Sequence, residues 1–98
     1  MELAAFRALT KLDAPPAGLS APLIGLWWMA KGDWNKAHSA VDDEEGKTAA
    51  WVHAHLHRVE GDLANAGYWY RQAGKPVSKA PLDKEWSEIA TALVGSGP

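Results

Sequence analysis

The stretch WVHAHLHRVEGDLANAGYWYRQAG, residues 51–74, decides the fold because a glycine and an aspartate separate two helical runs within it. Apolar residues at helical spacing predict an amphipathic helix from Lys47 to Glu60. Glycine adopts the left-handed conformation that ends a helix, and aspartate accepts hydrogen bonds from the free amides that begin the next one. With Gly61 and the aspartate after it as the turn, residues 47–74 are predicted to form a helix-turn-helix hairpin.

The same glycine–aspartate pair occurs earlier, at Gly32-Asp33, which lies 29 residues before Gly61-Asp62. An alanine follows both pairs at the same spacing, as Ala37 and Ala66. A small side chain at this position allows two helices to approach closely. The internal repeat therefore predicts a first hairpin over residues 20–43.

Helical patterns also flank the two hairpins. Leucine and phenylalanine recur every three residues in a predicted helix over residues 2–12. A complete apolar stripe predicts another helix over residues 83–94, with Asp83 as its N-terminal cap. No segment alternates apolar and polar residues over the length of a strand. The sequence thus predicts an all-α fold of about six helices: a single domain over residues 1–98, in which capping helices flank the hairpins.

The composition limits the classes of function. The formal net charge is -2 and the basic residues form no stripe, so we expect no nucleic-acid partner. The longest apolar run, APLIGLWWMA, is about half of a membrane span, so we expect no membrane partner. The N-terminal residues lack the pattern of a secretory signal, and a cytoplasmic location is expected. Because the chain has no cysteine, disulfides and thiolate metal sites are excluded.

The tryptophan content is high, with six tryptophans among 98 residues. A small domain cannot bury six such side chains completely, so one or two of them could line a pocket or an interface. Two repeats also leave more apolar surface than one small domain can cover. This excess predicts a symmetric homodimer with Trp27, Trp51 or Trp86 in the contact.

The two hairpins resemble the helical hairpins of tetratricopeptide and Sel1-like repeats over residues 21–74. In the second copy the pattern is carried by Ala54, Gly61-Asp62-Leu63, Ala66, Tyr70 and Ala73. The period is shorter than the usual ~34 residues, and there are two copies where stable arrays usually have at least ~3. Residues 51–74 are also similar to small uncharacterised bacterial and fungal proteins with W-x-H-A-x-L-H-R-x-E-G-D and Y-W-Y-R strings. That similarity implies a helical fold but indicates nothing about an activity.

Three histidines lie within five residues of the second hairpin, and a helical wheel at ~100° per residue separates them. His53 and His57 form an i, i+4 pair on the flank of the apolar stripe, and Glu60 lies one turn further along. His55 points roughly the other way and is expected to be exposed. His38, alone on a short helix, is also expected to be exposed to solvent.

The sequence leaves three interpretations of this flank open. In the first, His53 and His57 are semi-buried structural side chains that are hydrogen-bonded to Glu60, Asn65 or a tyrosine hydroxyl. In the second, they belong to a polar pocket walled by tryptophan. The candidate ligand-binding residues of this pocket are Trp28, His53, His57, Asn65, Tyr68, Trp69 and Arg71. Antiparallel pairing of the helices would place His53 near Trp69 or Tyr70.

A zinc site is the third interpretation, although the default expectation is no metal and no cofactor. His-x-x-x-His on a helix is sound ligand geometry, with His53 and His57 as ligands and Glu60 as a plausible third. The sequence shows no fourth ligand, and the glutamate base of metalloproteases is missing between the histidines.

We expect a non-enzymatic helical interaction module that forms a homodimer or docks a peptide or protein partner between its repeats. The alternative is a small-molecule-binding protein or a minimal hydrolytic enzyme. The catalytic candidates are then His53, His57 and Glu60, with a histidine as general base near neutral pH. A closed, tryptophan-lined cavity with converging histidines would favour the enzyme, and a flat groove with exposed aromatic residues would favour the module.

Overall fold

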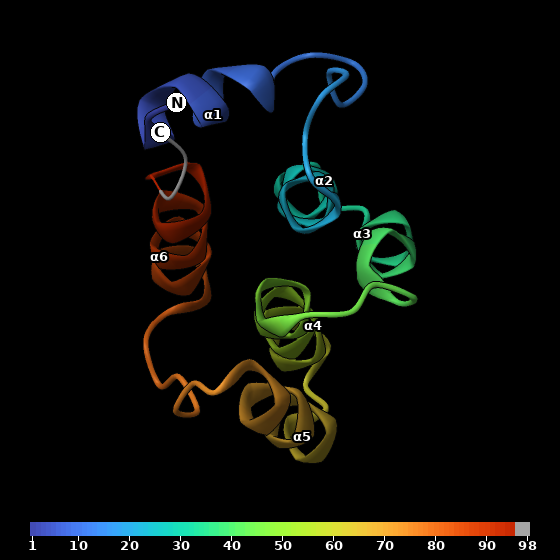
Figure 1. The fold of residues 1–98 in the computed structure, drawn as a ribbon, viewed down its shortest axis with the longest axis vertical. Coiled ribbons are helices and arrows are strands. Elements are labelled where there is room, and N and C mark those ends of the chain that lie inside the picture. Colours follow the sequence, from blue (N-terminus) through green and yellow to red (C-terminus); the bar gives the residue numbers. More distant parts are fainter. Residues whose placement is uncertain (96–98) are drawn as a thin grey trace.

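The computed structural model describes residues 1–95, and over this range it contains six α-helices and no β-strand. The helices are α1 (Leu3–Leu9), α2 (Ala21–Ala30), α3 (Trp34–Val41), α4 (Lys47–Glu60), α5 (Leu63–Ala73) and α6 (Leu82–Gly95), as drawn in Figure 1. The predicted all-α fold is confirmed. No helix in the described part of the chain is long and apolar enough to cross a membrane.

The two glycine–aspartate pairs form the turns that the sequence predicts. Gly32 and Gly61 have φ angles of 79° and 87°, in the region that favours glycine. The carboxylates of Asp33 and Asp62 each accept a hydrogen bond from the backbone amide three residues later, at 3.0 and 3.2 Å. As a result α2 packs against α3, and α4 packs against α5 (Figure 1).

The two flanking helices differ from their predicted bounds. Helix α1 ends at Leu9. The amide of Thr10 is shared between the carbonyls of Phe6 and Arg7, and the next two residues form only i to i-3 backbone hydrogen bonds, of 3.2 and 3.1 Å. Helix α6 begins at Leu82, one residue before its predicted start. Asp83 therefore lies in the first turn, and its carboxylate accepts from the amide of Lys84 at 2.9 Å.

Helix α4 is the central helix and packs against α2, α3, α5 and α6 (Figure 1). These neighbours cover its apolar stripe and also the sides that carry histidine. Its buried residues are Ala49, Ala50, Val52, His53, Ala54, His55, Leu56 and His57. A polar side chain on any side of the middle of α4 therefore faces another helix, where it needs a hydrogen-bond partner.

Two tryptophans that were expected at a dimer contact lie in the core. The side chain of Trp27 is 0% exposed and that of Trp86 is 9% exposed. Their indole N–H groups donate to the backbone carbonyls of Leu9 and Leu26, at 2.8 and 2.9 Å. Burial removes both tryptophans from any contact between folded copies, whereas Trp51 is partly exposed.

Candidate functional site

Three histidines from α3 and α4 converge between the two hairpins. The Nε2 atoms of His38 and His53 lie 3.0 Å apart. Each of the two and His57 offers a ring nitrogen, and these three nitrogens lie within 4.8 Å of one another. The rings of His53 and His57 stack with their centroids 4.9 Å apart, as expected for an i, i+4 pair on one side of α4. The cluster concentrates three imidazoles in one place.

Two tryptophans hold the imidazole rings in position. Trp69 of α5 stacks on His53 with the ring centroids 3.9 Å apart, which confirms the predicted pairing of these two residues. Trp34 stacks on His38 with the centroids 4.8 Å apart. The indole N–H of Trp34 donates to the carbonyl of Leu56 at 2.7 Å, so this ring is itself fixed to α4. The cluster is thus walled by tryptophan on two sides.

Glu60 lies behind the cluster. Its Oε2 atom is 3.1 Å from Nδ1 of His57. Because this contact occupies Nδ1, His57 offers Nε2 to any ligand in the cluster. The sequence suggested Glu60 as the third ligand beside His53 and His57. The structure groups His38 with these two, and it groups Glu60 with His57 and Asp62.

His38 is the residue of this site that sequence reasoning missed. It was expected to be exposed, but only 25% of its side chain is accessible. The signal was present in the short helix, since Trp34, Ala37, His38 and Val41 follow the i, i+3, i+4, i+7 spacing of one helical face. That face packs against α4, so His38 meets the pair of histidines there.

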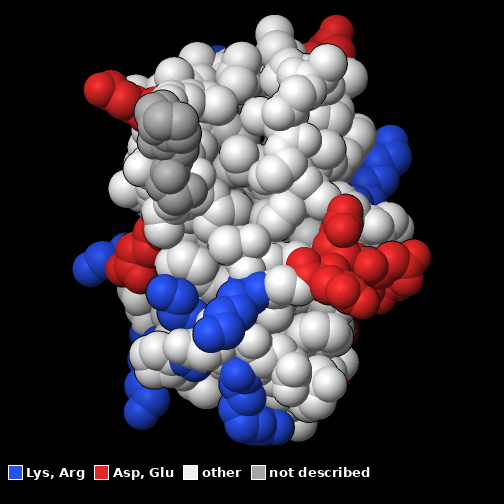
Figure 2. Space-filling view, in the orientation of Figure 1, with Lys and Arg blue, Asp and Glu red and all other residues white. Residues whose placement is uncertain are grey.

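The environment of the cluster keeps its most enclosed histidine neutral. Burial, together with the nearby His38 and His57, lowers the pKa of His53 to about 4. A neutral imidazole is the form that binds metals. On the open side, Oδ1 of Asp42 lies 3.8 Å from Nε2 of His38. Residues 42–45 are all acidic and exposed, and they form an acidic patch at the connection between α3 and α4 (Figure 2).

The remaining candidate ligand-binding residues do not join the cluster. Trp28 instead packs edge-on against Trp27 and lies 4.4 Å from the amino group of Lys36. The three exposed candidates on α5 are Asn65, Tyr68 and Arg71. Of the predicted pocket, the structure therefore brings His53, His57 and Trp69 together.

The expectation that His55 is exposed is wrong, because the side chain is 2% exposed. The helical wheel placed it correctly on the side of α4 away from His57, but α6 covers that side. Nδ1 of His55 lies 2.8 Å from Oε1 of Glu85 on α6.

Glu85 is the centre of a buried polar network that sequence reasoning did not find. Besides His55, it accepts hydrogen bonds from Nη1 of Arg58, at 2.9 Å, and from the hydroxyl of Tyr70. Burial alone would raise the pKa of the Glu85 carboxyl, but these three hydrogen bonds outweigh it and hold the pKa below the usual value. Burial and the neighbouring carboxylate raise the pKa of Tyr70. Glu85 is therefore an ionised carboxylate in the interior.

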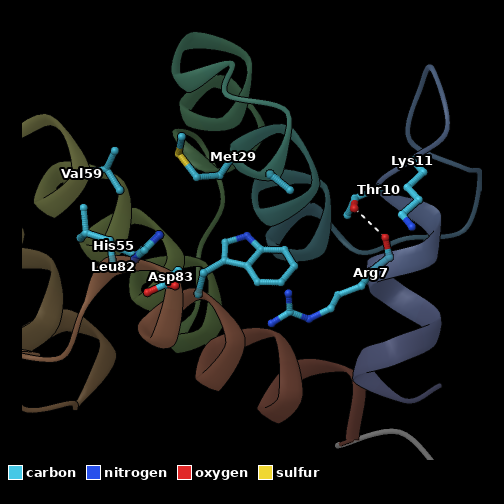
Figure 3. Close-up of a pocket in the computed structure, with 10 residues that line it drawn as sticks. Arg7, Thr10, Lys11, Met29, His55, Val59, Leu82 and Asp83 are labelled. Atoms are coloured by element: carbon cyan, nitrogen blue, oxygen red, sulfur yellow. Dashed lines mark hydrogen bonds between the residues drawn. The ribbon is translucent and has the colours of Figure 1, made fainter.

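The structure has a larger cavity of about 640 Å³ between α1, α2, α4 and α6 (Figure 3). A smaller cavity of about 350 Å³ lies where the start of α4 meets the end of α5. Neither cavity is lined by His53, His57 or Glu60, whereas His55 lines the larger one. The pocket expected beside the histidine pair is thus neither of these two cavities.

No family model, no curated protein and no solved structure matches this chain. The geometry of the three histidines and of the larger cavity therefore carries the functional argument.

Proposed function

We propose that this protein binds a divalent transition-metal ion, and that Zn²⁺ fits best, through His38, His53 and His57. The convergence of their three ring nitrogens within 4.8 Å carries the proposal. At a Zn–N distance of about 2.0–2.1 Å, nitrogen ligands of a tetrahedral ion lie roughly 3.3 Å apart. The 3.0 Å separation of the His38 and His53 Nε2 atoms needs only a small change to reach that spacing.

The donor set and its surroundings suit a transition metal. Imidazole nitrogen favours zinc, copper, nickel and iron, whereas calcium and magnesium prefer oxygen. The carboxylate of Glu60 on Nδ1 of His57 is the outer partner that commonly orients a metal-bound imidazole. Three histidines leave a fourth position on a tetrahedral ion, which a water molecule or the nearby Asp42 carboxylate can take.

The ion would stabilise the contact between the two hairpins. His38 belongs to the first hairpin, and His53 and His57 belong to the second. An ion bound to all three therefore stabilises the packed arrangement by mass action, because the unfolded chain does not bring them together. Neither of the two cavities is lined by His38, His53 or His57, which favours a metal-stabilised helical module over a hydrolytic enzyme.

Calorimetric titration of the chelator-treated protein with Zn²⁺ tests the proposal. We expect one ion per chain for the natural sequence and a large loss of affinity for His38→Ala, which removes one of the three ligands. Ser39→Ala is the matched control, since Ser39 is the exposed neighbour of His38 on α3. Equal zinc affinity of His38→Ala and Ser39→Ala would refute the site.

Self-association is a second candidate function, and the outer side of α5 supports it. Leu63 and Tyr68 are 68% and 45% exposed there, although both are large and apolar. The proposed occupant of this side is a second copy of the chain. Sedimentation at micromolar concentration should then show a dimer that Tyr68→Ser weakens, with Val77→Ser, at another exposed apolar position, as control. A monomer for the natural sequence would reject this candidate.

A further inference from the structure

The larger cavity has the size and the lining of a ligand site. Its volume of about 640 Å³ lies within the roughly 300–1,000 Å³ range of small-molecule pockets. Helices α1, α2, α4 and α6 contribute to its wall, so the first and last helices of the described chain and the central helix α4 all border the cavity. The apolar part of the lining includes Met29, Val59, Leu82 and Trp86. A ligand with an apolar body would therefore be covered on several sides.

The charged side chains of the cavity are separated by sign. Figure 3 shows Lys11 at the α1 side, the side chain of Arg7 extending from α1 toward the middle of the cavity, and Asp83 at the opposite side, next to Leu82. Arg7 is held in place, since its guanidinium carbon lies 5.4 Å from the ring centre of Trp86 and Nη2 donates to the hydroxyl of Ser87. An anionic group is therefore favoured at the α1 end and disfavoured at the Asp83 end.

His55 supplies a polar group near the Asp83 end (Figure 3). Its Nδ1 lies 2.8 Å from Oε1 of Glu85 and is therefore already engaged. Every fully buried side-chain nitrogen or oxygen among the described residues has a hydrogen-bond partner. Nε2 of His55 forms no hydrogen bond with another described residue, and His55 lines the cavity, so Nε2 is the ring nitrogen left for a ligand.

We infer that this cavity binds a small amphipathic carboxylate, with its carboxylate at Arg7 and Lys11 and its apolar body along Met29 and Trp86. A hydroxyl group at the far end of the ligand, which can donate or accept a hydrogen bond, would reach Nε2 of His55. The inference does not depend on metal binding, because none of the three clustered histidines lines the cavity.

Three eight-carbon probes separate the parts of this site. Octanoate has the anion and the apolar body, 1-octanol lacks the anion, and 8-hydroxyoctanoate adds the far hydroxyl. In calorimetric titrations with chelator present, we expect octanoate to bind roughly tenfold or more tightly than octanol, because its carboxylate gains charge-assisted hydrogen bonds. The hydroxy acid should bind more tightly than octanoate.

Variants assign the binding to the cavity. Arg7→Gln should weaken the binding of octanoate severalfold and leave the binding of octanol unchanged. The control is Lys36→Gln, which removes the same charge beside Trp28, outside the cavity, and should change the binding of neither probe. Met29→Trp should fill the cavity and weaken all three probes. The inference is overturned if octanoate does not bind at millimolar concentration, if octanol binds as tightly as octanoate, or if folded Met29→Trp binds octanoate like the natural protein.

Discussion

Nε2 of His53 lies 3.0 Å from Nε2 of His38, although the two residues belong to different hairpins. At this distance one Nε2 atom donates a hydrogen bond and the other accepts it, which two neutral imidazoles can do. A bound metal ion would replace that hydrogen bond with two coordination bonds. The same two atoms thus join the hairpins either weakly, through a proton, or strongly, through an ion, and the stability of the fold should depend on which one is present.

Zinc is therefore expected to raise the melting temperature of the natural protein relative to the protein in chelator. At a free Zn²⁺ concentration of one hundred times the Kd, the gain in unfolding free energy should be about 2.7 kcal/mol. His38→Ala should lose this zinc-dependent gain, and its melt in chelator should also fall below that of Ser39→Ala, because Nε2 of the buried His53 loses its partner. Thermal melts followed by circular dichroism measure both. A zinc-induced gain of the same size in His38→Ala would show that the ion binds elsewhere.

Glu60→Gln tests the outer partner of the cluster. The amide keeps the size of the side chain but cannot hold Nδ1 of His57 as a carboxylate does, so the zinc affinity should fall about 10- to 100-fold. Glu88→Gln, at an exposed position on α6, removes the same charge away from the cluster and should leave the affinity unchanged. Competition with a chromophoric chelator gives both affinities. If the two variants behave alike, Glu60 does not act on the metal site.

The sequence predicts the parts of this site that local spacing determines. The glycine–aspartate turns place α4 beside α5, and this antiparallel pairing brings Trp69 onto His53. The i, i+4 spacing places His57 next to His53. These features depend on one helix or on one hairpin, for which periodicity and caps are sufficient.

The parts that were not predicted depend on packing between hairpins and flanking helices. His38 reaches the cluster because α3 packs on α4, and His55 is buried because α6 covers the other side of α4. A helical wheel gives the direction in which a side chain points, but it does not show which other helix packs on that side. Glu85 is separated from His55 by 30 residues, and no local pattern links them.

The stability of the chelator-treated protein should fall as the pH falls from about 6.5 to 4. Burial and the charges of neighbouring imidazoles lower the pKa of His53 from 6.5 to about 4, so over this range the unfolded chain takes up a proton that the folded chain excludes. The groups that face His53 are His57 on its own helix, His38 on α3 and Asp42 directly after α3. The loss should be roughly 3 kcal/mol over the full window.

Urea denaturation between pH 6.5 and 5 measures this slope. The pKa of Glu85 is lowered in the folded state, so its carboxylate also loses stabilising effect as the pH falls. That second loss of stability comes mainly below pH 5, outside the measured range. His53→Gln cannot titrate and should show a clearly shallower slope than the natural protein. Parallel slopes for the two proteins would mean that another group is responsible.

Glu85→Gln should destabilise the fold by about 3–5 kcal/mol, because it removes one partner of a buried ion pair and leaves Arg58 without a counter-charge. Tyr70→Phe should cost about 1–3 kcal/mol, since it deprives the buried carboxylate of one of its three donors. Tyr70 donates its hydrogen bond to Glu85 itself, so Tyr70→Phe removes less stability when Glu85 is already replaced. The double variant should therefore lose less stability than the sum of the two single losses. Exposed Glu88→Gln is the control and should stay within about 0.5 kcal/mol of the natural protein. Chemical denaturation at pH 7 gives all four values, and strict additivity of the two changes would show that Tyr70 and Glu85 do not form one network.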